Sequence, residues 1–183
     1  MNLSNSGFKQ SFIRIPLFAA LFYIYFCAPF SLEHKAFVQT APAAASHNAL
    51  GDRYDPQRDP AKDLAAASEE AKRSNKNVFV VVGGEWCSWC HTLERFFQEH
   101  PDLEALLDKN YVTMKVSMSQ ENPNRAFLSH FPYIHGYPHI FILDASGKLI
   151  HSQPTNVLED DRSYNTKRFQ QFLERFAPKT VSR

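Results

Sequence analysis

The hydrophobic positions of the chain begin with one long apolar run near the N-terminus. Residues 15–32 form an uncharged stretch, and the polar start before it carries Lys9 and Arg14. A basic start followed by an apolar core is typical of a secretory signal or an N-terminal membrane anchor. Since the positive flank comes first, the rest of the chain is expected outside the cytoplasm. Residues 1–35 are therefore predicted to be a signal peptide or a membrane anchor, with residues 15–32 in the membrane if they stay uncleaved.

A polar segment separates this run from the first patterned element. Residues 36–59 are rich in Ala, Pro and polar side chains and show no sustained period, which predicts a linker. Asp59 and Pro60 form a helix start, because Asp caps free N–H groups and Pro suits the first helical position. The helix is predicted to run to about Ser74. One face of it is apolar: Leu64, Ala67 and Ala71.

The next hydrophobic segment changes its period within a few residues. Residues 78–82 are five consecutive apolar residues, four of them β-branched, which is typical of a short strand buried on both faces. Gly83 and Gly84 end this strand. From His91 onward the apolar positions are spaced as on a helix: Leu93, Phe96 and Phe97.

Beyond residue 100 the pattern predicts short elements separated by turn residues. Pro101 breaks the preceding helix, and Asp102 is predicted to cap one further turn. Asp144–Gly147 is a hairpin signal, and the polar residues 153–164 are expected to form a loop. The other predicted elements are strands at 111–118, 140–143 and 148–152, a short helix at 124–131, and a last helix from Thr166 with the stripe Phe169, Phe172, Leu173 and Phe176. The order α-β-α-β-α-β-β-α predicts an α/β domain.

Two cysteines lie where the first strand is predicted to meet its helix. Cys87 precedes the helix and Cys90 lies one turn inside it. Backbone N–H groups and the helix dipole stabilise an anion there, so a thiol loses its proton more easily. The thiolate is the nucleophile of disulfide exchange, and a second thiol on the same turn can displace the product. The pattern favours a redox dithiol over a structural staple, because so small a ring stabilises a fold by only about 2 kcal/mol.

Composition and charge narrow the function further. The formal net charge is +1, which predicts no nucleic-acid partner. Hydrophobic residues make up 44% of the chain, enough for a packed core. Of the three cysteines, Cys27 lies in the apolar run, so the predicted domain holds only the pair Cys87 and Cys90.

Three motifs together resemble the thioredoxin family, in particular its secreted or membrane-tethered members. They are E-W-C-S-W-C after a hydrophobic strand, G-Y-P-H before a second strand, and D-A-S-G-K between two antiparallel strands. The resemblance covers about residues 60–178. It implies a thioredoxin-like α/β fold, with a central mixed β-sheet flanked by helices and with Pro138 in the cis form beside the cysteines.

The resemblance also implies a mechanism. Cys87, as the exposed thiol, would attack a substrate disulfide, and Cys90 would displace the product. No cofactor is expected, because the cysteine pair is the redox centre; the partners would be protein disulfides and a second thiol protein. The backbone around His139 would be free to pair with an extended substrate segment. The residues expected to bind substrate are Trp86, Trp89, Tyr137 and Pro138.

The sequence departs from thioredoxin itself at three places. The buried acid that family members often carry six positions before the first cysteine is Val81 here, so Glu85 or a water is the expected proton acceptor for Cys90. Ser88 and Trp89 replace Gly-Pro between the cysteines, and glycines replace a tryptophan before Glu85. His91, in the first turn of the helix, is a candidate for tuning the thiols.

Other interpretations remain open at this point. C-S-W-C-H matches the attachment pattern of c-type haem, with His91 as the proximal ligand and Met114 or Met118 as the distal one. A copper carrier would use the two thiols with a histidine such as His135 or His139. A non-catalytic module that binds polypeptides is the third alternative. The favoured prediction is an exported thiol–disulfide oxidoreductase with no metal site.

Overall fold

The structure, a computed structural model, describes residues 53–179. The predicted signal or anchor segment, residues 1–35, lies outside the described residues, as does most of the predicted linker. Within residues 53–179, every helix is too short or too polar to cross a membrane.

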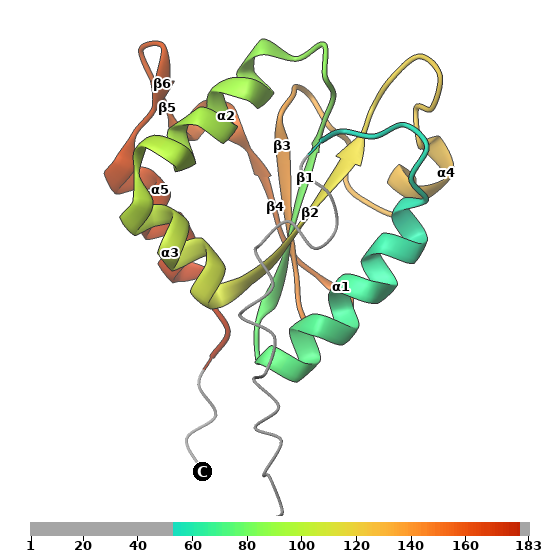
Figure 1. Cartoon of the computed structure of the whole chain (residues 1–183), viewed down its shortest axis with the longest axis horizontal. Coiled ribbons are helices and arrows are strands. Elements are labelled where there is room, and N and C mark those ends of the chain that lie inside the picture. The colour runs from blue at the N-terminus through green and yellow to red at the C-terminus, as the bar shows by residue number, and fades with distance from the viewer. Residues whose placement is uncertain (1–52, 180–183) are drawn as a thin grey trace, which may run out of the picture. The chain divides into compact units, whose positions relative to one another are not determined.

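The described residues form a four-stranded mixed sheet with helices on both faces (Figure 1). The strand order is β2-β1-β3-β4; β1 and β2 are parallel, whereas β1 with β3 and β3 with β4 are antiparallel. The predicted thioredoxin-like α/β fold is confirmed. The elements are α1 (Pro60–Ser74), β1 (Asn77–Gly83), α2 (Ser88–Glu99), α3 (Pro101–Asn110), β2 (Tyr111–Ser117), α4 (Arg125–Leu128), β3 (His139–Leu143), β4 (Leu149–Pro154), the 3-10 helix η1 (Thr155–Leu158), β5 (Glu159–Asp160), β6 (Ser163–Tyr164) and α5 (Thr166–Arg175).

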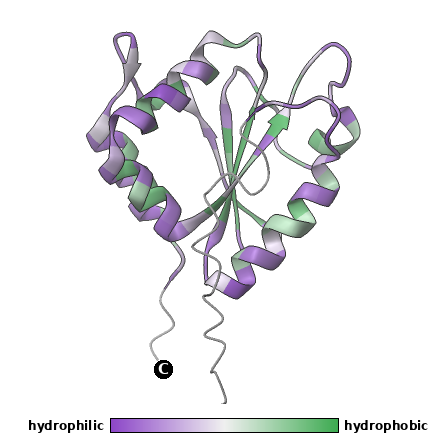
Figure 2. Cartoon of the chain, in the orientation of Figure 1, coloured by the Kyte–Doolittle hydropathy of each residue, from purple (hydrophilic) through white to green (hydrophobic). Residues whose placement is uncertain are grey.

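The strand β1 is buried along its whole length and separates two hydrophobic cores. Because successive side chains of a strand point to opposite faces, Phe79 and Val81 enter one core and Val78, Val80 and Val82 the other. Helices α2, α3 and α5 cover the first face, and α1 and α4 lie on the second (Figure 1). Apolar residues accordingly line the strands and the inner faces of the helices (Figure 2). The cysteine pair belongs to the first core.

The start of α1 follows the sequence prediction. Asp59 is the N-cap, and its side chain accepts hydrogen bonds from the N–H groups of Ala61 and Lys62. The helix ends at Ser74, and Asn75 follows with φ 54°, a left-handed conformation that asparagine tolerates. The short-range signals were therefore sufficient to place this helix.

Two predicted segments differ from the structure. Asp102 is not a cap: α3 is a ten-residue helix with His100 at the N-cap position and Asp102 in its first turn. Pro101 fits the first helical position, so the chain starts a new helix directly after α2 ends. The predicted loop 153–164 is wrong as well. It contains the end of β4, η1 and the β5–β6 hairpin, because Leu158 and Tyr164 are buried in the first core.

Tyr54 belongs to the folded part although it precedes the first helix. Its side chain is 2% exposed and lies in the same core as the cysteines. Its backbone N–H donates to the Glu85 carboxylate at 2.9 Å. The side chain of Asn122 donates to the carbonyl of Pro56 at 2.8 Å, which fixes the same segment from the other side.

Candidate active site

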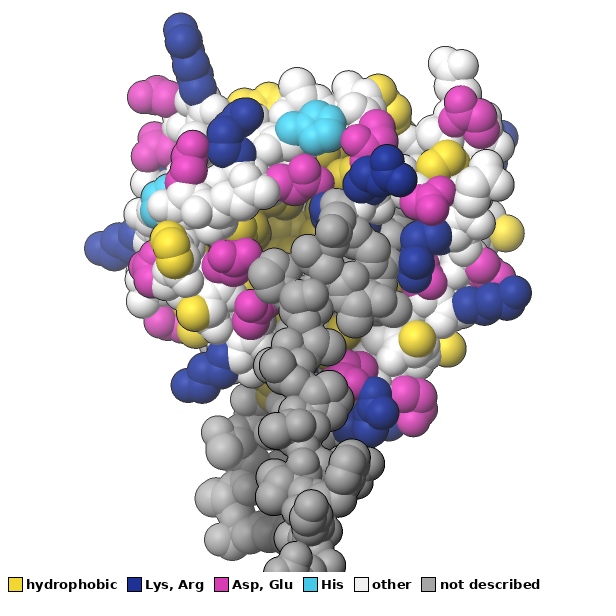
Figure 3. Space-filling model, viewed as in Figure 1, with side chains coloured by type: hydrophobic (Ala, Val, Ile, Leu, Met, Phe, Trp, Pro, Cys, Tyr) yellow, Lys and Arg dark blue, Asp and Glu magenta, His cyan; other side chains and the backbone are white. Residues whose placement is uncertain are grey.

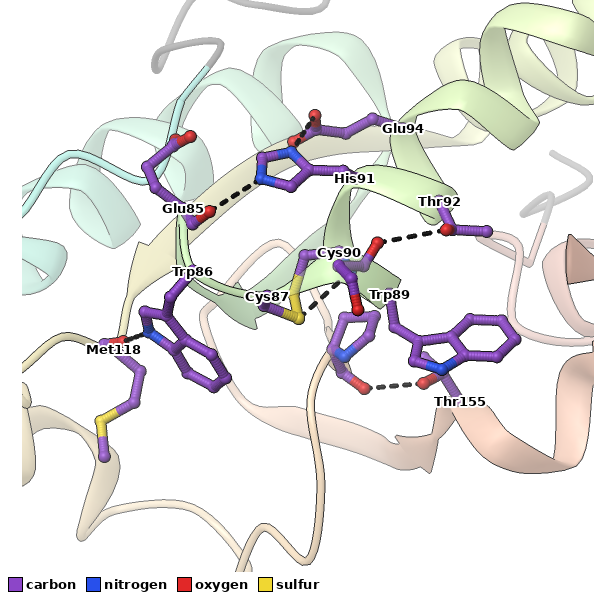
Figure 4. Close-up of a disulfide and its surroundings, with 12 residues drawn as sticks. Glu85, Trp86, Cys87, Trp89, Cys90, His91, Thr92, Glu94, Met118 and Thr155 are labelled. Carbon is purple, nitrogen blue, oxygen red and sulfur yellow. Dashed lines mark hydrogen bonds and ion pairs between the residues drawn. A yellow bond between two sulfur atoms is a disulfide. The ribbon is translucent and has the colours of Figure 1, made fainter. Parts of the chain in front are cut away.

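Cys87 and Cys90 form a disulfide at the N-terminus of α2 (Figure 4). Cys87 is the N-cap residue, with an extended backbone, and its Sγ accepts the N–H of Cys90 at 3.1 Å. The predicted passage from strand to helix is confirmed. The free N–H groups of the first turn therefore face the sulfur of residue 87, where they can stabilise a thiolate.

The prediction of an exposed thiol at Cys87 is wrong for this oxidised form. Cys87 is 4% exposed and Cys90 is fully buried. The sulfur of Cys87 is turned inward, because it is bonded to Cys90 and accepts a backbone N–H of the same turn. The side chains around the disulfide therefore cover it almost completely.

The two glycines before Glu85 allow close packing under the disulfide. A Cβ on Gly83 would come within 2.5 Å of the Cys90 sulfur and 3.0 Å of the Tyr54 ring. A Cβ on Gly84 would collide with the Trp86 indole and lie 2.8 Å from the Met118 carbonyl. Both positions therefore exclude larger residues. From the sequence, these two glycines had been interpreted only as the end of a strand.

The Trp86 indole is held by a hydrogen bond at its N–H, while most of the side chain is exposed to solvent. Its indole N–H donates to the Met118 carbonyl at 2.7 Å, yet the side chain is 61% exposed. The Tyr137 ring meets it edge-on, with the ring centroids 5.6 Å apart. Burial raises the pKa of Tyr137, so its hydroxyl stays protonated. The structure thus brings Trp86 and Tyr137 together, as expected for two walls of a groove.

The Tyr137–Pro138 bond is cis, as the resemblance implies. The antiparallel pairing of β1 with β3 ends at Val82 and His139. Pro138 comes directly before His139 in the chain, so it lies just beyond this end of the ladder, next to Gly83. The carbonyl of Pro138 accepts a hydrogen bond from the Thr155 hydroxyl at 2.7 Å (Figure 4). Thr155 thus connects the cis-proline loop to the 3-10 helix η1.

The expectation of a free backbone at His139 is wrong. β3 is an inner strand, and His139 is paired with Val82 on one side and with Pro154 on the other. The hairpin through Asp144 covers the edge of β3 with β4, so the open edges of the sheet are β2 and β4. The residues directly before Pro138 belong to no strand.

The His139 side chain is buried next to the cis-proline. It is 2% exposed, its Nε2 lies 2.8 Å from the Ser152 hydroxyl, and its Nδ1 has no hydrogen-bond partner. Burial, with smaller contributions from His135 and His151, lowers the pKa of His139 to about 4. The imidazole is therefore neutral at neutral pH.

Trp89 lies on the other side of the disulfide from Trp86 (Figure 4). It packs edge-on against Tyr164 with ring centroids 5.5 Å apart, and the Tyr164 hydroxyl donates to the Trp89 carbonyl at 3.4 Å. The β5–β6 hairpin thus supports the start of α2. Trp89 does not share the groove formed by Trp86 and Tyr137.

A charged pair lies near the position of the missing acid. Val81 pairs in register with Lys115 of β2, whose ammonium group lies 2.8 Å from the Glu94 carboxylate. The same ammonium group lies 5.4 Å from the centre of the Tyr54 ring. Glu94 comes one helical turn after Cys90, and helical spacing places the two on one face of α2. Burial is the main reason that the pKa of Tyr54 is strongly raised, with the charge of Glu94 next.

Glu85 and His91 contact each other at the entrance to α2. The His91 Nε2 donates to the Glu85 carbonyl at 2.9 Å, and its Nδ1 lies 3.5 Å from the Glu94 carboxylate. The Glu85 carbonyl, followed by Glu94, raises the pKa of His91. The Glu85 carboxylate accepts the backbone N–H of Tyr54, so it serves to hold the segment before α1.

The residues considered for haem and copper are dispersed. Within residues 53–179 no three His, Cys, Asp or Glu side chains come close enough to hold a metal ion. Met114 lies in the core on the opposite face of the sheet from Cys90, and His135 stacks edge-on with Tyr133. The position of Met114 excludes it as a ligand opposite His91.

These features define a thioredoxin-like domain with a C-x-x-C disulfide at a helix N-terminus. Comparison with known proteins agrees, because residues 59–145 match the family model described as thioredoxin-like. The resemblance to the thioredoxin family is therefore confirmed.

Similar proteins include a curated relative that matches over a short segment and two solved structures. Spermatogenesis-associated protein 20 of Rattus norvegicus is 34% identical over 58 residues, which is 32% of this chain and 7% of that protein. The chain therefore spans a small part of this relative's length. A disulphide isomerase from Xylella fastidiosa Temecula1 has a TM-score of 0.58 at 21% identity, covering 67% of this chain and 94% of its own. The oxidised C-terminal domain of Neisseria meningitidis DsbD has a TM-score of 0.51 at 18% identity, covering 64% and 96%.

Proposed function

We propose that this protein is an exported thiol–disulfide oxidoreductase that acts on protein disulfides through Cys87 and Cys90. The observation that carries the proposal is a disulfide at the N-cap of α2, between an open tryptophan face and a cis-proline loop. A helix N-terminus stabilises the thiolate that exchange requires. The resemblance in fold to a disulphide isomerase and to a DsbD domain supports the same chemistry.

The exchange consists of two displacements on sulfur. In the reduced protein, the Cys87 thiolate attacks one sulfur of a substrate disulfide, and the other substrate sulfur leaves as a thiolate. Cys90, as a thiolate, then attacks the Cys87 sulfur in the mixed disulfide, and the second substrate sulfur leaves. The substrate gains two electrons, and the protein ends as the Cys87–Cys90 disulfide present in the structure. A second thiol protein reduces it again; the relative potentials of the partners set the direction, and no cofactor takes part.

Several side chains assist this reaction. The raised pKa of His91, caused by the Glu85 carbonyl and by Glu94, favours its positive charge one turn after Cys87, and that charge favours the Cys87 thiolate. Trp86 and Tyr137 hold the apolar part of the substrate, and the backbone before Pro138 pairs with its main chain. Thr155 and Tyr164 hold the cis-proline loop and the start of α2 in place.

The location of the protein follows from the first residues of the chain. The uncharged run of residues 15–32 after Lys9 and Arg14 directs the domain out of the cytoplasm, cleaved or anchored. A fusion of residues 1–60 to alkaline phosphatase, which is active only after export, tests this part independently. An inactive fusion in a cell that exports a control signal would contradict it.

Reduction of insulin disulfides by a thiol donor tests the activity. Wild type is expected to accelerate the reaction, and Cys87→Ser to abolish the acceleration. Cys90→Ser is expected to accumulate a mixed disulfide that mass spectrometry detects, because no second thiol displaces the product. If wild type and Cys87→Ser behave alike, the domain is a polypeptide-binding module rather than an enzyme.

A further inference from the structure

A hollow of the surface is lined in part by Trp86 and Tyr137, the two aromatic walls of the site. It has a volume of about 500 Å³, and Trp86, Tyr137 and Met118 form its apolar end. The rest of its lining is polar or charged, with Ser119, Gln120 and Arg125, the first residue of α4. The exposed Trp86 indole is held in place by its hydrogen bond to Met118, so this end of the hollow is preformed.

Arg125 is the charged side chain among the residues that line this hollow. Within residues 53–179 its guanidinium makes neither an ion pair nor a hydrogen bond. Two other basic side chains of the domain differ: Arg58 is paired with Asp63 and Lys115 with Glu94. The charge of Arg125 is therefore available to a ligand in the hollow.

The hollow continues beyond Arg125. A second one, of about 540 Å³, shares Pro123 and Arg125 with the first and is lined further by Phe127 and His130. It is also lined by Asp59, whose carboxylate caps α1 and is paired with Lys62. An extended polypeptide can thus pass Arg125 with a cysteine near Cys87. Acidic and basic side chains are mixed on the face that Figure 3 shows, which presents no broad basic surface.

We propose that this groove selects disulfide-bonded polypeptides that carry an acidic side chain a few residues from the reacting cysteine. The acidic group binds Arg125, and an apolar neighbour packs between Trp86 and Tyr137. A guanidinium presents two parallel N–H donors to a carboxylate, which gives direction as well as charge. The proposal rests on the proposed disulfide exchange and adds its substrate class.

Cysteine peptides joined to a chromogenic thiol provide the test. All peptides share one sequence and one leaving thiol, with a single Glu, Gln or Lys placed two, three or four residues from the cysteine. The reduced full chain releases the leaving thiol at a measured rate, and each rate is divided by the rate with glutathione. The best Glu peptide is expected to react about three- to five-fold faster than its Lys counterpart, the range of a partly exposed ion pair. Salt is expected to reduce this ratio toward one.

Charge reversal makes the test specific. Arg125→Glu is expected to reverse the preference, and Arg125→Gln to remove it. Arg162→Glu is the matched control: it makes the same charge change at an exposed arginine of the β5–β6 hairpin, on the opposite flank from α4 (Figure 1). It is expected to keep the wild-type preference.

The outcomes separate the two proposals. If no peptide reacts faster with wild type than with Cys87→Ser, the disulfide exchange itself is overturned. If exchange occurs but Glu and Lys peptides react equally at low salt, the acidic selection alone is overturned. An equal change of preference in Arg125→Glu and Arg162→Glu would also overturn it, because the effect would then come from net charge. Circular dichroism of the variants confirms that they are folded, and the salt dependence of wild type needs no variant.

Discussion

The hydroxyl of Thr155 donates a 2.7 Å hydrogen bond to the carbonyl oxygen of Pro138 and is buried with it. The bond joins residues 17 positions apart and ties the cis-proline loop to the segment after β4. Pro138 has no N–H of its own, so this carbonyl is its one polar backbone group. The donor to the Pro138 carbonyl is thus a side-chain hydroxyl rather than a backbone N–H of a neighbouring strand.

Replacing Thr155 by Val is expected to weaken both the fold and the reaction. A buried carbonyl left without a donor costs about 1–3 kcal/mol, because it loses its water without a replacement. We expect a loss of that size in the free energy of unfolding, measured with urea, and slower insulin reduction. Thr155→Ser keeps the hydroxyl and is expected to retain most of both. Equal stability of the Val and Ser variants would contradict a role for this hydrogen bond.

Gly83→Ala tests the close packing beneath the disulfide. The added methyl group would lie 2.5 Å from the Cys90 sulfur and 3.0 Å from the Tyr54 ring, so one of them has to move. Overpacking of this kind costs about 1–3 kcal/mol in unfolding free energy. Gly136→Ala is the matched control, since its methyl group would meet no atom within 4 Å. If the two alanine variants are equally stable, the packing at Gly83 is looser than the structure shows.

The parts of the fold that short-range patterns define could be predicted from the sequence. The Asp59–Pro60 start of α1 and the buried run of β1 each depend on neighbouring residues, and both were placed closely. The cis form of Pro138 came from the resemblance alone. The packing of Tyr54 could not be predicted, because a single aromatic residue in a polar segment has no period to show its burial.

The role of residues 153–164 was hidden for a related reason. Their polar composition suggested a loop, yet Thr155 reaches Pro138 and Tyr164 reaches Trp89 across 17 and 75 positions. Contacts of that range leave no local trace, although the spaced apolar residues Leu158 and Tyr164 were a signal that part of the segment is buried. The position of Glu94 near the disulfide could have been anticipated, since Glu94 follows Cys90 by one helical turn. Its pairing with Lys115 of β2 could not.

Glu94→Gln is expected to lower the pKa of the Cys90 thiol. The carboxylate lies one turn after Cys90 and is paired with Lys115; replacing it by an amide removes a negative charge from beside the site, which favours the Cys90 thiolate. We expect a decrease of about half a unit to one unit, the effect of one nearby charge at a partly screened site. The pKa is measured by the pH dependence of Cys90 alkylation in protein whose Cys87 is already blocked.

Glu99→Gln is the control for this experiment. Glu99 lies at the end of the same helix, away from the disulfide, and the variant makes the same charge change. Its Cys90 pKa is expected to equal that of wild type. A shift of equal size in both variants would assign the effect to net charge and not to the carboxylate at position 94.

The neutral His139 predicts a loss of stability on mild acidification. Its pKa is about 4 in the folded protein and about 6.5 in an unfolded chain, so the unfolded state binds the proton first. The stabilisation is complete above about pH 6.5 and falls as the pH decreases toward 4. When the pH is lowered from 7.5 to 5, protonation of His139 in the unfolded state is expected to decrease the free energy of unfolding by about 2 kcal/mol. His135 and His151 add a smaller electrostatic contribution that lowers the pKa of His139 in the same direction.

His139→Gln separates this contribution from those of the carboxylates. The amide can still meet the Ser152 hydroxyl but does not titrate, while Asp144 and the other acids remain in both proteins. The difference in unfolding free energy between wild type and variant, measured with urea, is expected to change by about 2 kcal/mol between pH 7.5 and pH 5. A difference that stays constant with pH would mean that the buried imidazole keeps its ordinary pKa, and the desolvation argued for this position would be wrong.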